Sequence, residues 1–414
     1  MFRDIATDIK EMINFLTFKH PLIKMVNVYR KHLHHNTNRI AEDHRMKLRV
    51  EKTALIQVLQ KIYSITEKKT GLPILSNALV KTSEHQTVEL SATDLELSVW
   101  TQVDAAVEEP GATTVSARKL LDIVRELPQE HVNLESLPNY RLSITAGRSH
   151  FELPTIAPED FPHVKLYEGI DLSSCDVGVL TKALTKTMYG IPAEEDPFSI
   201  AGLYWHPVED GQMRFISSDG HRLAYYQVPG SALPALAVGD GIIIPRKGVQ
   251  EILRILEKES EAALGLHENC LIVKTSNTLL SVQLLEGEFP EYQVIIPEER
   301  PFSFSIESDI LFHALKRVAV LTNQKWRHVR FIVSEGTLEL ESGNPEGGNA
   351  NDLLDIDYTG ESFNIAFNVR YILEAIQAVE GPQLRFEWVD EFHGGVFMDT
   401  EDPGYLGLIM PMVI

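Results

Sequence analysis

Apolar residues recur at helical spacing in six stretches of the chain. The pattern is clearest in 246–256, RKGVQEILRIL, where Val249, Ile252, Leu253 and Leu256 fall on one face. The other five stretches cover 51–65, 118–127, 176–191, 307–321 and 369–379. We therefore expect six amphipathic helices, each packed by one face against a core.

Alternating apolar and polar residues follow these helices. The stretches 141–153, 270–285 and 383–398 each alternate over several residues and are interrupted by turn residues, which is typical of paired strands. A helix followed by strands thus recurs six times, and two such half-units make one unit of roughly 120 residues. The pattern predicts an α+β chain of three repeated domains, 46–168, 169–299 and 300–414.

Residues 1–45 have a different composition from the rest of the chain. They carry eight Lys and Arg against five Asp and Glu, and a patch containing His32, His34 and His35. They lack the long apolar core and small-residue cleavage site of a secretory signal. We expect a disordered or non-native N-terminal extension.

The overall charge excludes several kinds of protein. A formal net charge of -21, spread evenly, would repel nucleic acid and anionic membranes. No apolar run is long enough for a membrane span, so no membrane partner is expected. Cys175 and Cys270 lie far apart without metal-ligand spacing, which favours the reducing cytoplasm and predicts neither metal nor cofactor.

Positive and negative charges are separated along the chain. The acidic residues cluster in loop-like stretches such as VEEPGA, PAEEDP and DTEDPG, whereas cations occupy polar positions of the expected helices. These cations are Lys52, Lys61, Arg118, Lys119, Arg125, Lys182, Lys186, Arg246, Lys247, Arg254, Lys316, Arg317 and Arg370. The distribution predicts positively charged helices and negatively charged loops. This separation permits a DNA-facing surface in an acidic protein.

The common catalytic motifs are absent from the sequence. There is no P-loop, HExxH or GxSxG, and the Asp219-Gly220 step favours a turn over an acid-base pair with His221. Asp355 and Asp357 could serve a metal-dependent nuclease or nucleotidyl transferase, although a solvated strand face explains them more simply. A repeat scaffold that binds only proteins is another alternative.

Eight stretches carry a resemblance to a known family. They are LPILSNAL (72–79), TDLEL (93–97), EPGATTVSARKLLDIVRELP (109–128), SDGHRLA (218–224), IPRKGV (244–249), GEFPEY (287–292), FNVRYILEAIQA (367–378) and MPMVI (410–414). Together, from Met46 to Ile414, the chain resembles the bacterial sliding clamp, the β subunit of DNA polymerase III.

The resemblance implies a ring-shaped head-to-tail homodimer with helices lining a central channel and sheets outside. Such a ring encircles double-stranded DNA without sequence preference and without catalysis. It acts as a processivity factor in the cytoplasm, at the nucleoid, and tethers the replicative DNA polymerase. The clamp loader and the repair and replication-regulatory proteins that carry a clamp-binding peptide are its other implied partners.

The resemblance also implies roles for particular residues. Its DNA-contacting positions are Lys69, Arg118, Lys119, Arg246 and Lys247. Its hydrophobic partner-peptide cleft corresponds to Ile200, Gly220, His221, Arg222, Leu223, Pro290, Ile295, Leu408, Met410, Pro411 and Met412. Its dimer interface corresponds to Phe151, Leu153, Val320 and Leu321. Two features depart from the family: the acidic loop residues Glu194, Glu195 and Asp196, and Val413 where an arginine is frequent.

Overall fold

The structure is a computed structural model that divides into two compact units. It describes residues 45–66, 71–83, 85–167, 169–193, 201–208, 211–234, 236, 239–322, 327–344 and 348–412. The first unit runs to Asp94 and continues over Trp100–Val164; the second takes in Leu95–Val99 and the chain from Lys165 onward. Residues 1–44, Lys69, Glu194, Glu195, Asp196, Ile200 and Val413, all named above, lie outside the described residues.

Among the described residues, the first unit contains two α-helices and eight strands. The helices are α3 (Lys52–Ile62) and α4 (Ala117–Glu126). The strands are β1 (Lys47–Glu51), β2 (Asn77–Thr82), β3 (Thr87–Thr93), β4 (Leu97–Glu109), β5 (Ala112–Ser116), β6 (His131–Leu137), β7 (Arg141–Ala146) and β8 (Ser149–Pro154). They follow the order β8-β7-β6-β1-β4, while β3 pairs with β4 and β2, and β2 pairs with β5. Among the described strands β8 pairs with β7 alone and so lies at an edge.

The two helices of the first unit pack against each other and share a terminal contact. Lys52, at the start of α3, donates its ammonium protons to the carbonyl oxygens of Arg125 and Leu127 at 3.0 and 2.5 Å. These are carbonyls at the end of α4 that find no partner inside the helix. At the other end of α4 the Ser116 hydroxyl accepts from the amide of Lys119 at 3.4 Å. One of the predicted helix cations therefore serves a structural contact.

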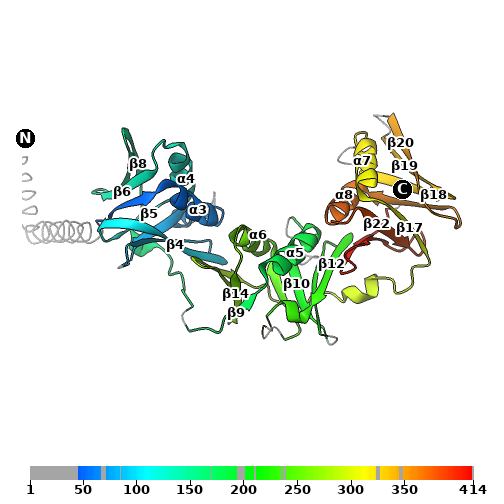
Figure 1. The fold of residues 1–414 in the computed structure, drawn as a ribbon, viewed down its shortest axis with the longest axis horizontal. Helices are drawn as coiled ribbons and strands as arrows, with labels where there is room; N and C mark the ends of the chain where they lie inside the picture. Colours follow the sequence, from blue (N-terminus) through cyan, green and yellow to red (C-terminus); the bar gives the residue numbers. More distant parts are fainter. Residues whose placement is uncertain are drawn as a thin grey trace, which may run out of the picture. The chain divides into compact units, whose positions relative to one another are not determined.

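In the part of the chain that the structure describes, the second unit contains four α-helices. They are α5 (Val177–Thr187), α6 (Arg246–Leu256), α7 (Ser308–Ala319) and α8 (Val369–Gln377). Helix α5 packs against α6, and α7 against α8, as Figure 1 shows. With α3 and α4 these are the six helices predicted from the apolar spacing, so that prediction is confirmed.

The strands of the second unit form three runs. One runs β16 (Thr278–Gln283), β15 (Cys270–Lys274), β14 (Ala262–His267) and β9 (Ser173–Cys175). A sheet of eight strands runs β13 (Ile242–Pro245), β10 (Gly202–Pro207), β11 (Gln212–Ser218), β12 (Arg222–Pro229), β24 (Tyr405–Ile409), β23 (Gly395–Asp399), β22 (Gln383–Trp388) and β17 (Phe302–Glu307). A third sheet runs β20 (Gly348–Asp355), β19 (Thr337–Asn344), β18 (His328–Ser334) and β21 (Phe363–Asn368).

Strands far apart in the sequence meet at the centre of the eight-stranded sheet. β12 pairs with β24 in antiparallel register, from Arg222 opposite Ile409 to Tyr226 opposite Tyr405. The pair Leu223 and Leu408 lies within this register. The central part of the chain and its C-terminal part are therefore joined by backbone pairing.

Helix α6 approaches its sheet unusually closely, and the sequence shows why. Its third residue is Gly248, where an added Cβ would lie 2.4 Å from a methyl carbon of Val282 on β16. No side chain fits in that space without movement of the neighbour. The glycine after the Arg246 and Lys247 pair thus sets how tightly the helix start packs on the strand.

Candidate DNA-binding and partner-binding sites

The helices α4, α6 and α8 begin in the same way. Each follows directly on a strand, and each carries a cation in its first three positions: Arg118 and Lys119, Arg246 and Lys247, or Arg370. The side chains of Arg118, Lys119 and Arg370 are exposed. The repeated layout predicted from the sequence therefore exists in three dimensions, with cations at the equivalent helix starts.

Arg246 is less available than its sequence position predicts. The side chain is half-buried, and its guanidinium donates a hydrogen bond to the carbonyl oxygen of Ile191. Burial, followed by the nearby positive charges of Arg222 and Arg370, lowers the pKa of Arg246. Lys247 beside it is also half-buried. Of the predicted DNA-contacting residues within the described ranges, Arg118 and Lys119 are the most exposed.

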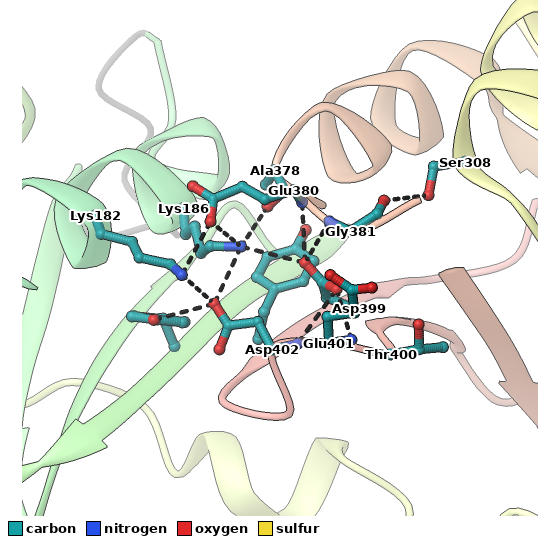
Figure 2. A network of polar contacts seen from close by, with 12 residues as sticks. Lys182, Lys186, Ser308, Ala378, Glu380, Gly381, Asp399, Thr400, Glu401 and Asp402 are labelled. Atoms are coloured by element: carbon teal, nitrogen blue, oxygen red, sulfur yellow. Dashed lines mark hydrogen bonds and ion pairs between the residues drawn. The ribbon is translucent and has the colours of Figure 1, made fainter. Parts of the chain in front are cut away.

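Two other helix cations belong to an internal network. Figure 2 shows Lys182 and Lys186 of α5 directed at acidic residues that lie after α8 and around the turn between β23 and β24. The Lys186 ammonium lies 2.8 Å from the carbonyl oxygen of Ala378, 3.6 Å from Asp399 and 3.4 Å from Asp402. Lys182 lies 2.8 Å from Asp402 and 2.9 Å from Glu380.

The network is buried at its centre and exposed at its edge. The Lys186 side chain is 2% exposed, whereas that of Lys182 is 36% exposed. Asp399 accepts four backbone amide protons, from Glu380, Gly381, Glu401 and Asp402. Burial alone would raise the pKa of Asp399, but these hydrogen bonds and the charge of Lys186 outweigh it and lower the pKa. Lys186, which the sequence placed among the cations at polar helix positions, is therefore an internal ion and does not belong to an exposed cationic surface.

The loop 218–223 is shaped by its own polar side chains. The carboxylate of Asp219 accepts from the backbone amides of His221 and Arg222, both at 3.1 Å. Gly220 has φ of 83°, a conformation that favours glycine. Asp219 is thus an Asx-turn residue, in line with the turn expected from Asp-Gly, and the loop leaves His221 exposed.

Arg222 is paired within the protein. Its guanidinium contacts the carboxylate of Asp219 at 2.9 Å and that of Glu374 on α8, and it lies 4.3 Å from the ring centre of Tyr371. Burial alone would raise the pKa of Glu374, but the hydrogen bonds from Arg222 and Arg370 lower it. The sequence assigned Arg222 to the cleft wall as a group that fixes peptide atoms. In this structure its charged end connects β12 to α8, and its role in the cleft stays a prediction.

Three of the apolar residues predicted for the cleft, Leu223, Leu408 and Met410, belong to one cluster. Ile216, Leu223, Tyr292, Val396, Leu406 and Leu408 are its buried members. Met410, Phe289, Ile296 and Met398 are among the partly buried residues packed against it. We call these ten residues the apolar cluster. The backbone amide of Met410 donates to the carbonyl oxygen of His221 at 2.8 Å, which connects the end of β24 to the loop 218–223.

The remaining predicted cleft residues lie along the same segments of chain. Pro290, Ile295 and Met412 are exposed, and Pro411 is half-buried. Sequence reasoning missed Tyr292, Phe289 and Val396 as members of the cluster. The signal was present in part, since Phe289 and Tyr292 stand in the GEFPEY stretch and Leu406, Leu408 and Met410 share a face by alternation.

The predicted interface residues differ in exposure. In the first unit, Phe151 is 40% exposed on the edge strand β8, whereas Leu153 on the same strand is buried in its own core. In the second unit, Val320 at the end of α7 is 77% exposed and Leu321 is half-buried. Phe151 and Val320 thus offer the larger apolar surfaces.

Asp355 at the end of β20 and Asp357 just beyond it are both exposed. Leu354, Ile356 and Tyr358 alternate with them and are buried, so the two carboxylates point outward. Within the described ranges, no group of three or more His, Cys, Asp or Glu side chains could hold a metal ion. In the same ranges, every helix is too short or too polar to cross a bilayer.

Comparison with known proteins identifies the family. Family models of the DNA polymerase III beta subunit match over nearly the whole chain: the N-terminal domain over 46–165, the central domain over 175–291 and the C-terminal domain over 293–413. The beta sliding clamp of Caulobacter vibrioides is 34% identical over 375 residues, covering 89% of this chain and all of that protein. That of Escherichia coli K12 is 31% identical over 371 residues, with the same coverage.

Solved structures agree with the sequence comparison. A Caulobacter crescentus beta sliding clamp matches with a TM-score of 0.83 and 33% identity, covering 90% of this chain and 100% of that one. A Bartonella birtlesii DnaN sliding clamp bound to griselimycin matches with a TM-score of 0.84, 30% identity and the same coverage. A Pseudomonas aeruginosa DnaN sliding clamp bound to griselimycin matches with a TM-score of 0.80 and 29% identity, covering 89% and 100%.

These matches do not support the nuclease alternative. The three helix pairs, the cations at the helix starts and the apolar cluster lie in a chain that the family models match from 46 to 413. The chain therefore belongs to the DNA polymerase III beta subunit family and is a DNA sliding clamp, a non-catalytic processivity factor of DNA replication.

Proposed function

We propose that two copies of this chain close head to tail into a ring around double-stranded DNA. Each chain contributes domains at 46–168, 169–299 and 300–414, and the ring acts in the cytoplasm, at the nucleoid. The observation that carries the proposal is the repeated helix start, because strand, helix and cation recur at α4, α6 and α8. Three equivalent cationic positions per chain suit an interaction with a regular, sequence-independent phosphate backbone.

The DNA contacts are proposed to be weak. Arg118 and Lys119 are exposed and free to turn toward phosphate, while Arg246 is held by Ile191 and Lys247 is half-buried. Lys69 is proposed from the family resemblance alone. A closed ring needs no tight grip, since it leaves DNA only by opening, and few phosphate contacts keep sliding fast.

Ring closure is proposed to use two strands that lie at sheet edges among the described strands. β8 ends the sheet of the first unit and β20 ends a sheet of the second. Exposed strand edges tend to pair with another chain. Phe151 on β8 and Val320 after α7 provide apolar surface for such a contact, with smaller shares from Leu153 and Leu321. A contact between unlike surfaces is heterologous, and two copies close the circle.

The topological claim is tested by retention on circular and linear DNA. The protein is loaded onto nicked circular DNA with the clamp loader of the same bacterium, passed through a sizing column and then treated with a restriction enzyme that cuts the circle once. We expect retention on the circle and loss after the cut. Equal retention on both forms would overturn the ring proposal, because phosphate binding alone does not depend on DNA ends.

The apolar cluster is the proposed docking surface for partner proteins. Phe289, Ile296, Met398 and Met410 are only partly buried there, and Met412 follows at the end of the described chain. Flexible methionines adapt to different apolar peptides. We propose that peptides of the replicative polymerase, the clamp loader and repair proteins bind here, and that griselimycin, bound in structures of two relatives, binds the same surface.

The docking surface is tested with a double variant, Met410→Ala with Met412→Ala. Leu223 and Leu408 are unsuitable, because both are fully buried and their truncation would cost stability. Surface plasmon resonance then measures binding of the catalytic subunit of the same bacterium's DNA polymerase III. We expect at least a tenfold loss of affinity, or about 1.4 kcal/mol, while light scattering shows an intact dimer.

The matched control is Leu166→Ala, which truncates an exposed apolar residue outside the apolar cluster. We expect this control to bind the polymerase as the unmodified protein does. Unchanged affinity of the methionine variant would overturn the assignment of the surface.

A further inference from the structure

The segment 289–296 contributes three residues to the apolar cluster, and two aromatic side chains, Phe289 and Tyr292, hold it on the sheet. Tyr292 is 2% exposed, whereas Val294, two residues later, is 78% exposed. Tyr292 begins the short 3-10 turn Tyr292–Ile295 and is its buried residue. Its ring belongs to the apolar cluster, while its hydroxyl lies outside the cluster, on polar groups of the eight-stranded sheet.

The sheet presents an aromatic surface to this segment. On β10, Leu203 and Trp205 face the core, so Tyr204 and His206 face the other side by alternation. Phe289 stacks on Tyr204 with ring centres 4.9 Å apart and 11° between the planes. Tyr204 stacks in turn on His206 at 4.9 Å and 20°. Phe289 and Tyr292 therefore dock the segment at two points on the same strand.

The hydroxyl of Tyr292 lies between an arginine and a histidine. Arg214 on β11 lies 3.4 Å from the Tyr292 oxygen, and an arginine can only donate. The oxygen therefore accepts from Arg214. Nδ1 of His206 lies 3.0 Å from the same oxygen, and we assign the donor role in this contact to the Tyr292 hydroxyl. With this assignment His206 is neutral and carries its proton on Nε2. Gln227 accepts from the guanidinium of Arg214 at 2.9 Å and holds it in place.

We infer that Tyr292 is a positioning residue, held between Arg214 and neutral His206, that keeps the segment 289–296 in place as one wall of the partner-docking surface. Protonation of His206 then weakens partner binding. The inference rests on the proposed docking surface and adds to it a control that lies on the sheet. His206 and Arg214 themselves are not members of the apolar cluster.

The direction of the pH effect follows from the groups around His206. Protonated Nδ1 becomes a donor, so it can no longer accept the Tyr292 proton, and the imidazolium lies near the Arg214 cation. The other groups that act on His206 are Asp240, which favours the charged form, and the rings of Tyr204 and Tyr292. Burial first and Arg214 second lower the pKa of His206.

Because the pKa of His206 is lowered, we expect the segment 289–296 to stay docked on the sheet at neutral and higher pH. The hydrogen bond is fully present above the ordinary histidine value of about 6.5 and is lost as the pH falls through the lowered value. Partner binding should follow the same curve, with full affinity near pH 7.5 and weaker affinity near pH 5.

The experiment measures griselimycin binding to the full chain by isothermal titration calorimetry at pH 7.5 and 5.0. Tyr292→Phe removes only the hydroxyl, and losing its hydrogen bonds with His206 and Arg214 should weaken binding about fivefold at pH 7.5. His206→Asn keeps an acceptor near the Nδ1 position and cannot be protonated in this range. We expect it to bind as the unmodified protein does at pH 7.5 and to keep that affinity at pH 5.0.

The control is His267→Asn, which removes a histidine on β14 that packs on Tyr167 rather than on Tyr292. It should keep the pH dependence of the unmodified protein. Hydrogen exchange of the segment 289–296 gives a second readout, with faster exchange expected in Tyr292→Phe and, at pH 5.0, in the unmodified protein. This readout applies even if a variant binds no ligand.

The outcomes separate the inference from the proposed function. If Met410→Ala with Met412→Ala weakens griselimycin binding, but Tyr292→Phe and acidification do not, the positioning role is overturned and the docking surface stands. If His206→Asn keeps the full pH dependence, the switch is assigned to the wrong residue. If the methionine variant binds griselimycin normally, the docking surface itself is wrong, and the exchange data alone decide whether Tyr292 holds the segment.

Discussion

Replacing Lys186 by methionine tests the internal ion network of the second unit. Methionine matches the length and apolar character of the buried lysine stem and removes only the charge. The change leaves the Ala378 carbonyl oxygen without the ammonium donor at 2.8 Å. It also removes the buried cation that pairs with Asp399, whose side chain is 0% exposed. An acidic residue then remains in a dry position without its counter-charge.

The cost is estimated from the contacts that remain. Removing one member of a buried ion pair typically costs about 3 to 5 kcal/mol. Asp399 keeps its four backbone donors and Asp402 keeps Lys182, so we expect the lower end, about 3 kcal/mol. For a unit of this size each kcal/mol shifts the melting temperature by about 2 to 4 °C, which gives a decrease of about 6 to 12 °C.

The assay is thermal unfolding followed by calorimetry, with Lys182→Met as the matched control. Lys182 contacts two of the same acids but is 36% exposed, so its loss should cost at most about 1 kcal/mol. Equal melting temperatures for the two variants, or a Lys186→Met variant as stable as the unmodified protein, would refute the reasoning. Either result would mean that water replaces the ammonium without a large penalty.

The unmodified protein and the Lys186→Met variant also allow a test by pH. Despite burial, hydrogen bonds and the Lys186 charge lower the pKa of Asp399, and contacts with Lys182 and Lys186 lower that of Asp402. A lowered carboxyl pKa contributes stability that is present above the unfolded value of about 4 and is lost as the pH falls below it. Lys186→Met reduces this lowering, so the stability difference between the two proteins should narrow below about pH 4.

Three further predictions concern packing, hydrogen bonding and the charged end of Arg222. Gly248→Ala should cost about 1 to 3 kcal/mol because its Cβ would meet Val282 at 2.4 Å, whereas Gly71→Ala, with open space around it, should be neutral in the same melting assay. Tyr405→Phe removes the hydroxyl that donates to the Ala375 carbonyl at 2.7 Å and should cost about 1 to 3 kcal/mol by urea unfolding; the exposed Tyr140→Phe should change nothing. Glu374→Gln should destabilise the protein, and a double-mutant cycle with Arg222→Met should show a coupling of about 1 to 3 kcal/mol; additive effects would contradict their contact.

The helices could be predicted from the sequence because their signals are local. The apolar spacing of Val249, Ile252 and Leu256 fixes one face of α6 without reference to any distant residue. The order of strand and helix around each helix that begins with a cation could also be predicted from local sequence. Turn chemistry was equally local, since Asp219 and Gly220 form their turn from neighbouring atoms.

The ion pairs could not be predicted because their partners are distant in sequence. Lys186 reads as one more polar position on a helix, and only folding brings it to a carbonyl 192 residues away. Arg222 likewise meets Glu374 at a separation of 152 residues. A single sequence therefore indicates which helices carry charge, but not which charges are internal. The role of Tyr292 could not be predicted for the same reason, because His206 and Arg214, which contact its hydroxyl, lie 86 and 78 residues away.

The pairing of β12 with β24 makes the chain sensitive to insertions and deletions. Leu406 and Leu408 belong to the apolar cluster, while Ile409 belongs to the core that contains Phe367 and Phe397. Alternation assigns these roles to opposite faces of one strand. A substitution in β24 therefore affects one face at a time. Loss of a single residue before it would exchange the two faces, so that folding and partner recognition would fail together.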